Sequence, residues 1–326
     1  MSTLVTVSRL TKSFRVLGHR QLIAVSDFSI EIEKGEVLGL IGESGSGKTT
    51  VGRCLAGLAP HDSGTISWDI GRPTIGVVFQ DPRESMNPKF RLWESIADPL
   101  AARGVKNRRV VAQRVREAAG TVGLGEESLH KRPADLTDEV IQRASLARAL
   151  VVNPELLILD EPTTSLDPDS RAGMLELVNG LRQLREMTAL FISHDISAVE
   201  KISDRVCIMY LGMIMELGPT AELFRSPRHP YTRALLGSHL ALDPEQRPLP
   251  LELRGEIPDP LERPPGCPLT PRCPWVTDRC GAQVPELRTV GLVEVACIRA
   301  EEIAAYREAA QQEAAHGGGQ GVGVGG

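Results

Sequence analysis

The stretch that decides the fold is Gly42-Glu43-Ser44-Gly45-Ser46-Gly47-Lys48-Thr49, followed by Thr50. It fills every position of the GxxxxGK[ST] phosphate loop. The apolar run 36–41 precedes it, and residues 49–58 after it have helical spacing. A strand that passes through a glycine-rich loop into a helix presents backbone N–H groups to phosphate, whereas a simple turn would not need this pattern. The sequence therefore predicts a nucleoside triphosphate site.

Each residue type in this loop suits phosphate chemistry. The backbone N–H groups wrap the phosphates, Lys48 reaches the β and γ oxygens, and the Thr49 hydroxyl ligates Mg²⁺. A second signal is the apolar run 156–159, which ends in Asp160-Glu161. In phosphate-loop proteins the first acid helps to hold Mg²⁺ and the second polarises the attacking water. An aspartate at a strand end can also cap the next helix, but this alternative leaves the second acid unexplained.

The composition narrows the class of protein. A chain of 326 residues fits one large domain with an appendage, or two modest domains. The net charge of −5 argues against nucleic acid as the main partner. The longest apolar run, around 206–215, falls short of the roughly 18 residues of a membrane span. The first residues lack the basic and apolar pattern of a secretory signal. We therefore expect a cytosolic protein that reaches a membrane only through a partner.

The order of the apolar runs predicts an α/β fold. Residues 155–160 and 188–193 have the pattern of fully buried parallel strands, and 170–186 between them has helical periodicity. This alternation indicates a parallel sheet covered by helices. Residues 81–150 are richer in charge and helix formers, so they predict a helical insert.

The six cysteines divide into two groups. Cys54 and Cys207 lie in apolar surroundings and are expected to be small core residues. The other four follow the spacing C-x5-C-x6-C-x16-C at the end of a segment with ten prolines between 244 and 274: Cys267, Cys273, Cys280 and Cys297. Four thiols in such a segment indicate a metal site, and both zinc and iron–sulfur clusters accept four cysteines. The missing C-x2-C pairs lower the case for zinc, and four unrelated cysteines are the remaining alternative.

Three further motifs resemble the ABC ATPase family, in family order over about residues 4–235. Residues 159–167 resemble its Walker B motif and D-loop, with Ser165 and Asp167 in the latter. Residues 78–82 resemble its Q-loop and 191–195 its switch histidine. The resemblance implies that Gln80 senses Mg²⁺ and the γ-phosphate as a metal ligand beside Thr49 and Asp160. It also implies that His194 holds the γ-phosphate and the attacking water next to the catalytic Glu161, and that Phe14 stacks on adenine.

The family's LSGGQ signature is degenerate in this chain. The register of residues 142–150 places it at Leu136-Thr137-Asp138-Glu139-Val140. In the family this segment binds the γ-phosphate held by the opposite subunit. Each acid could oppose that phosphate by on the order of 4 kcal/mol at 4 Å, and side chains replace glycines where the backbone must come close. Acids nevertheless suit the first turn of a helix.

The lost signature affects the partner's ATP rather than this chain's own. A homodimer would have two weakened sites, and a heterodimer would have one good site and one poor site. We therefore expect a second, non-identical ABC ATPase subunit.

The C-terminal part resembles the ATPase subunits of oligopeptide, dipeptide and nickel importers. The resemblance rests on residues 226–236, on 266–274, and on 81–82 with 85–88. It implies a [4Fe-4S] cluster on Cys267, Cys273, Cys280 and Cys297, with zinc as the alternative.

Together these features predict a P-loop ABC ATPase with a parallel-sheet core and a helical subdomain, plus an irregular cysteine-rich C-terminal extension. The expected divisions are a nucleotide-binding domain at 1–235, an extension at 236–300 and a flexible tail at 301–326. The expected function is ATP hydrolysis that powers an importer of peptides or a related solute such as nickel. The expected partners are two transmembrane permeases and, through them, an extracytoplasmic solute-binding protein, at the cytoplasmic face of the cell membrane. A regulatory or non-transport ABC ATPase is the alternative.

Overall fold

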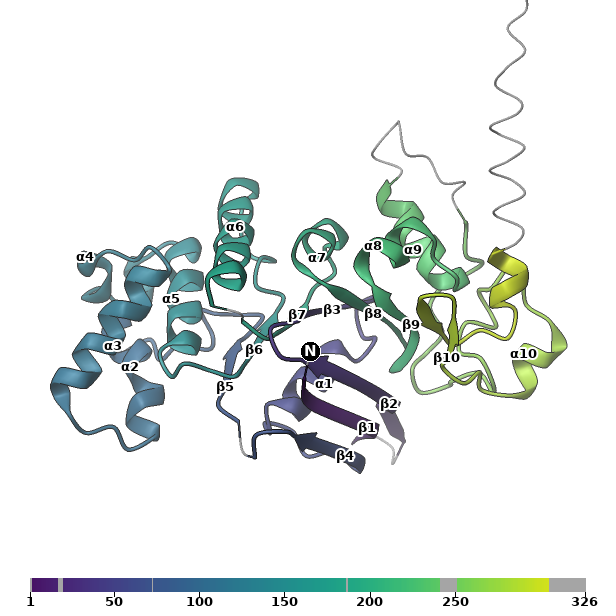
Figure 1. The fold of residues 1–326 in the computed structure, drawn as a ribbon, viewed down its shortest axis with the longest axis horizontal. Coiled ribbons are helices and arrows are strands. Elements are labelled where there is room, and N and C mark those ends of the chain that lie inside the picture. Colours follow the sequence, from purple (N-terminus) through teal and green to yellow (C-terminus); the bar gives the residue numbers. More distant parts are fainter. Residues whose placement is uncertain (1, 17–19, 72, 186, 241–250, 305–326) are drawn as a thin grey trace, which may run out of the picture. The chain divides into compact units, whose positions relative to one another are not determined.

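The computed structural model describes residues 2–16, 20–71, 73–185, 187–240 and 251–304 (Figure 1). The backbone divides into two compact units, Met1–Met213 (unit 1) and Ile214–Gly326 (unit 2). The domain boundaries predicted after residues 235 and 300 stay predictions. Residues 305–326, most of the predicted tail, lie outside the described residues.

Unit 1 contains five parallel strands in the order β5-β6-β7-β3-β8. Their bounds are Ile75–Val78 (β5), Leu156–Asp160 (β6), Ala189–Ile192 (β7), Val37–Ile41 (β3) and Arg205–Tyr210 (β8). All residues of β3, β6 and β7 are buried, which explains why these strands are continuous apolar runs in the sequence. The predicted parallel core is therefore confirmed.

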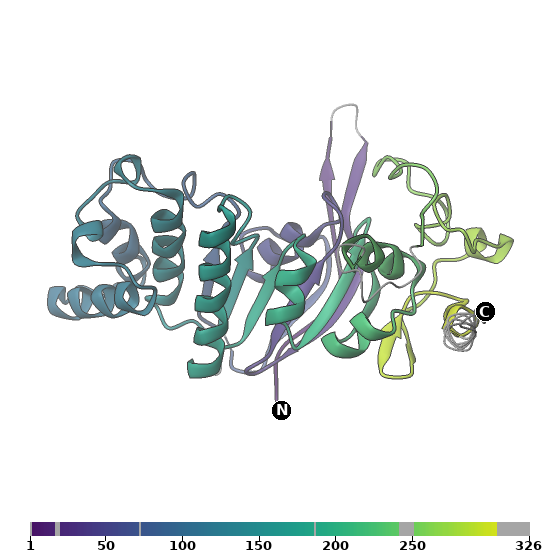
Figure 2. The same ribbon diagram turned by 90° about the horizontal axis from the view of Figure 1, so that it is seen from above.

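Helices cover both faces of this sheet. On one face α7 (Ile196–Ile202) approaches β3 so closely that a Cβ at Gly39 would lie 2.5 Å from Val199. On the other face α1 (Lys48–Leu55) packs against β7, where a Cβ at Gly52 would lie 2.9 Å from Ile192. Figures 1 and 2 show α6 (Pro168–Arg185) beside α7. The sheet is thus held between layers, and its carboxyl ends carry the loops that contain the predicted site.

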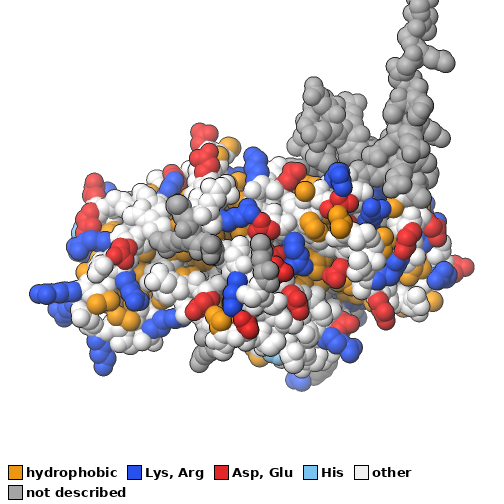
Figure 3. Space-filling view, in the orientation of Figure 1, with side chains coloured by type: hydrophobic (Ala, Val, Ile, Leu, Met, Phe, Trp, Pro, Cys, Tyr) orange, Lys and Arg blue, Asp and Glu red, His pale blue; other side chains and the backbone are white. Residues whose placement is uncertain are grey.

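Two further groups of elements complete unit 1. An antiparallel sheet has the order β2-β1-β4, with β1 at Thr3–Arg15, β2 at Gln21–Glu33 and β4 at Ser63–Trp68. A helical group comprises α2 (Leu92–Ala102), α3 (Arg108–Thr121), α4 (Glu126–Leu129), a 3₁₀ turn (Pro133–Asp135) and α5 (Asp138–Leu150). Figure 3 shows several Lys and Arg side chains over α2 to α4 on the face that it draws. This helical group lies within the predicted helical insert.

Unit 2 has shorter elements. They are β9 (Met213–Pro219), α8 (Thr220–Arg225), α9 (Pro230–Leu240), α10 (Asp278–Ala282), β10 (Arg288–Val290) and β11 (Val293–Val295). The strands pair antiparallel, β9 with β11 and β11 with β10. The buried Glu216 carboxylate on β9 accepts the backbone N–H groups of Arg228 (2.7 Å) and His229 (2.9 Å). Burial raises the pKa of Glu216 to about 7, and its two hydrogen bonds fix the approach to α9.

Candidate nucleotide-binding and catalytic site

The phosphate loop connects β3 to α1 in the predicted way. The Lys48 ammonium donates to the carbonyl oxygens of Gly42 (2.7 Å) and Glu43 (3.0 Å) and lies 3.4 Å from Ser46 Oγ. Burial lowers the pKa of Lys48, and the charges of Glu161, Asp160 and Glu43 oppose this shift. A buried cation at the N-terminus of a helix is favourably placed for a phosphate group.

Two of the three predicted Mg²⁺ ligands lie together. The Thr49 hydroxyl donates to Asp160 Oδ1 at 3.0 Å, although 111 residues separate them in the chain. Burial raises the pKa of Asp160, and the Thr49 hydrogen bond opposes the shift. A desolvated carboxylate beside a hydroxyl is a hard oxygen pair that fits Mg²⁺. The third predicted ligand, Gln80, instead donates through Nε2 to Glu161 Oε2 at 3.3 Å.

Glu161 is the point where the predicted catalytic residues meet. Besides Gln80, its Oε2 lies 3.2 Å from His194 Nδ1 and 2.9 Å from the Thr164 hydroxyl. Its backbone has a φ of 48°, which is costly for a residue with a side chain and is typical of functional sites. Gln80 and His194 therefore both contact the same oxygen atom of Glu161, Oε2.

Thr164 is a residue that sequence reasoning missed. It lies three positions after Glu161 in the segment that resembles the D-loop, and its backbone N–H also donates to the Glu161 carbonyl at 3.3 Å. The sequence feature that could have indicated it is a hydroxyl side chain three positions after the predicted general base. In the same segment the Asp167 carboxylate accepts the N–H groups of Asp169 and Ser170, both at 3.1 Å, so it caps α6. A hydrogen bond from the Ser170 side chain, followed by these backbone hydrogen bonds, lowers the pKa of Asp167.

Phe14 lies near the end of β1 with 42% of its surface exposed. The Lys12 ammonium stands 5.2 Å from the ring centroid, a cation–π arrangement. Lys12 also pairs with Asp62 at 3.1 Å. Stacking of Phe14 on adenine stays a prediction.

The degenerate signature forms the start of α5. Thr137 is the N-cap, and its hydroxyl accepts the Val140 N–H at 3.4 Å. Asp138 and Glu139 occupy the first helical turn, as expected from the helix dipole. Neither acid is an isolated charge, because Arg83 pairs with Asp138 and Arg143 pairs with Glu139 (2.9 Å). The repulsion energy expected from the sequence assumed that both acids are unpaired, so it overstates their repulsion of the partner's phosphate. The steric effect of side chains in place of glycines is unchanged.

Comparison with known proteins finds matches for both the N-terminal and the C-terminal part of the chain. Residues 25–164 match the ABC transporter family, and residues 215–280 match the oligopeptide/dipeptide transporter C-terminal region. The chain is 36% identical over 320 residues to a di/tripeptide transport ATP-binding protein of Pseudomonas aeruginosa, covering 93% of this chain and 99% of the relative. It is 39% identical over 316 residues to a putative peptide import ATP-binding protein of Brucella abortus, covering 90% and 93%.

The chain belongs to the ABC transporter ATP-binding subunits. The chain is accordingly an ATP-hydrolysing transporter subunit, while the roles of Glu161, His194 and Lys48 stay predictions. Within the family, the chain has the oligopeptide/dipeptide type of C-terminal region.

Solved structures show the same fold. A dimeric ATP-binding cassette bound to ADP and phosphate has a TM-score of 0.61 and 25% identity, over 67% of this chain and 99% of that chain. A protein of Clostridium perfringens that is part of an ABC transporter complex has a TM-score of 0.61 and 24% identity, over 75% of this chain and 97% of that chain. None of the helices in the described part of this chain is long and apolar enough to cross a membrane.

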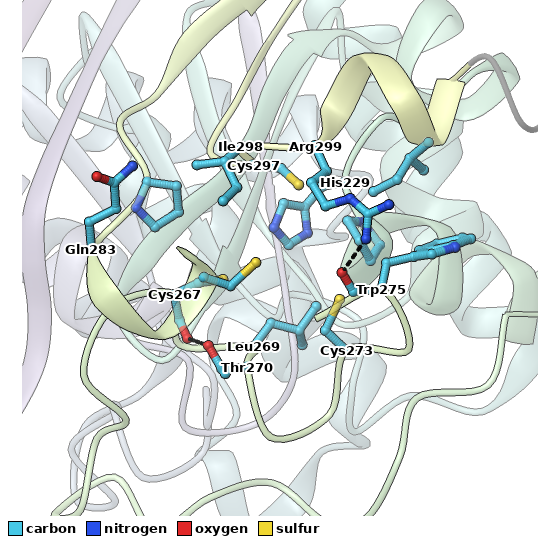
Figure 4. Close-up of a pocket in the computed structure, with 14 residues that line it drawn as sticks. His229, Cys267, Leu269, Thr270, Cys273, Trp275, Gln283, Cys297, Ile298 and Arg299 are labelled. Carbon is cyan, nitrogen blue, oxygen red and sulfur yellow. Dashed lines mark hydrogen bonds between the residues drawn. The ribbon is translucent and has the colours of Figure 1, made fainter. Parts of the chain in front are cut away.

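In unit 2 the four C-terminal cysteines line one pocket (Figure 4). The Cys267 N–H donates to the Cys280 carbonyl at 2.8 Å, which joins two of the loops that carry them. Burial raises the pKa of Cys267 to about 11 and that of Cys297 to about 12. Among the described residues, no group of three or more Cys, His, Asp or Glu side chains is close enough to hold one metal ion. The thiols thus share a pocket without forming a single-ion site.

Proposed function

We propose that this chain is the ATP-hydrolysing subunit that powers an importer of peptides or a related solute. The observation that carries the proposal is the contact of Gln80 and His194 with Glu161, in a chain that also has an oligopeptide/dipeptide transporter C-terminal region. Relatives named as a di/tripeptide transport ATP-binding protein and a putative peptide import ATP-binding protein support the solute class. In the proposal, the subunit binds two permeases at the cytoplasmic face of the membrane, through the helical group beside Gln80, and an extracytoplasmic protein delivers the solute.

In the proposed mechanism, Lys48 and the loop amides hold the β- and γ-phosphates. Thr49 and Asp160 would hold Mg²⁺, which neutralises phosphate charge when bound. A water oxygen attacks the γ-phosphorus, and its proton goes to Glu161 Oε2 as the bond to the ADP oxygen breaks. His194, which lies 3.2 Å from that oxygen, orients the water.

Purification of the chain from its own cells tests the transport role. We expect it to co-purify with integral membrane subunits, and we expect its ATP hydrolysis to rise when the solute-loaded binding protein is added. A regulatory or non-transport ABC ATPase, the alternative, would be isolated without permeases. The assembled Glu161 site speaks against a silent regulator.

The proposed assembly is a heterodimer with one degenerate site. The dimeric ATP-binding cassette among the similar structures supports pairing of two ATPase subunits. In such a pair, Asp138 and Glu139 would stand where the partner's γ-phosphate approaches. Their side chains obstruct a position that requires glycine, whereas the residues around Glu161 in this chain stay intact.

In a Glu161→Gln background, which silences this chain's own site, restoring Leu-Ser-Gly-Gly-Gln at 136–140 should raise ATP hydrolysis by the assembled complex at least about twofold if the partner keeps its own catalytic glutamate, because the second site gains a binding signature for phosphate. The rate per complex at saturating ATP measures this. Thr137→Ser alone is the matched control, since it keeps both acids and should give no gain. If inactivating the glutamate of either subunit proves equally damaging, the asymmetry is wrong.

We also propose that Cys267, Cys273, Cys280 and Cys297 hold a [4Fe-4S] cluster. Their shared pocket supports a common ligand. In a [4Fe-4S] cubane each cysteine binds a different iron, so the four cysteine sulfurs lie farther apart than they do around one zinc ion. A cluster would order a segment with few regular hydrogen bonds.

Anaerobically purified protein should contain about four irons per chain and absorb broadly near about 400 nm. Cys297→Ser should lower the iron content and should make proteolysis of the 267–297 segment faster. Cys54→Ala, which removes a buried thiol of unit 1, should leave the iron content unchanged. Stoichiometric zinc without iron in such a preparation would overturn the proposal.

A further inference from the structure

The segment that follows Gln80 is a compact turn. The Ser85 N–H donates to the Asp81 carbonyl at 3.1 Å, and the Met86 N–H donates to the Arg83 carbonyl at 3.3 Å. The Met86 side chain is buried and anchors the end of the turn. These bonds tie residues 81–86 into one turn that directly follows Gln80 in the chain.

Arg83 attaches this turn to the start of α5. Its Nη1 donates to the Pro133 carbonyl at 2.9 Å and its Nη2 to the Leu136 carbonyl at 3.1 Å. Its Nε and Nη2 both reach Asp138 Oδ1, at 3.1 and 2.5 Å. Of these acceptors, Asp138 alone carries a full negative charge, so it supplies the ionic part of the attachment.

A second arginine strengthens the connection farther along α5. Arg148 donates through Nη1 to the Ser85 carbonyl at 2.7 Å and through Nη2 to Ser85 Oγ at 2.8 Å. The turn is therefore attached near the start of α5 through Arg83 and farther along α5 through Arg148, and only the ionic part of the Arg83 attachment depends on an acid at position 138. A glycine there, as in the family signature, would leave Arg83 with backbone carbonyls alone.

We propose that Asp138 is a positioning residue for this chain's own ATP site. Through Arg83 it fixes the turn behind Gln80 to the start of α5, so that Gln80 Nε2 keeps its contact with Glu161 Oε2. The acid that weakens the signature thereby links the signature helix to the catalytic carboxylate within one subunit. This inference rests on the proposed role of Glu161 and not on the heterodimer.

The expected size of the effect follows from the exposure of the pair. The side chains of Arg83 and Asp138 are 44% and 57% exposed, and pairs of this kind change an equilibrium by about two- to fivefold. Deletion of one partner would thus give a weak signal. Reversal of one charge puts two like charges together and should give a larger one.

The test is a charge-reversal cycle of Arg83→Asp, Asp138→Arg and the double variant, in the full chain and in its assembled transporter. Each single change should slow ATP hydrolysis about five- to tenfold at unchanged KM for ATP, because the Lys48 loop is not touched. Each should also speed hydrogen exchange of segment 80–86. The double variant should restore both readouts to within about threefold. Lys201→Asp, the same charge change at an exposed position of α7 outside the helical group, should alter neither.

Two outcomes overturn the inference. One is a double variant whose loss of ATP hydrolysis equals the combined losses of the two single variants, since additive effects exclude a specific pair. The other is unchanged exchange of segment 80–86 in both single variants, whatever the hydrolysis rate. If the unmodified complex itself hydrolyses no ATP, the proposed function fails, and the exchange measurement still decides whether the pair positions the turn.

Discussion

Replacing Glu161 with glutamine should lower ATP hydrolysis by the assembled complex at least about 100-fold while ATP binding is retained. Glutamine keeps the volume of the side chain and a carbonyl oxygen that Thr164 can still reach. It cannot accept the proton of the attacking water. Lys48 and Thr49, which lie on the phosphate-binding side, are unchanged. Turnover at saturating ATP, together with equilibrium nucleotide binding, separates the two effects.

Glu176→Gln provides the matched control, because it makes the same chemical change on the exposed face of α6. It should leave turnover unchanged. In the proposed heterodimer, Glu161→Gln should also be far more damaging than the equivalent change in the partner. Near-normal turnover of the Glu161 variant would show that another group accepts the proton.

The sheet and the phosphate loop could be predicted because their determinants are local. Burial on both faces makes β3, β6 and β7 continuous apolar runs, which are visible in one sequence. Helix boundaries were less exact. The helix predicted at 49–58 ends at Leu55, because Gly57 has a φ of 70° and its N–H bonds back to the Cys54 carbonyl at 3.0 Å. Gly57 is visible in the sequence as a helix-ending glycine, so this earlier end could have been predicted.

The partners of the signature acids could not be predicted. Arg83 and Asp138 are 55 residues apart, and their contact depends on how the turn after Gln80 packs on α5. From the sequence alone, both acids could only be treated as bare charges facing phosphate. The structure pairs Asp138 with Arg83 of the same chain, and the internal positioning role proposed above rests on this pair. The convergence of Gln80 on Glu161 rather than on Asp160 has the same origin, since tertiary packing sets it.

Replacing Gly47 with alanine should lower the unfolding free energy by about 2–5 kcal/mol and weaken ATP binding at least about tenfold. Gly47 has a φ of 101°, and a Cβ there would lie 2.2 Å from the Ala24 carbonyl oxygen. Both the strained backbone and the contact with backbone atoms oppose the change. Because Gly47 directly precedes Lys48, any shift that relieves the clash moves the ammonium that faces the phosphates.

Gly45→Ala separates these two causes. Gly45 also has a positive φ, 79°, but a Cβ there would meet nothing within 4 Å. It should therefore cost only the backbone term, about 1–2 kcal/mol. Denaturant unfolding of the full chain and nucleotide titration measure both variants. A Gly47 variant no less stable than the Gly45 variant would mean that strand β2, which carries Ala24, moves aside without cost. In that case the close approach of β2 to the phosphate loop would not be what holds Lys48 in place.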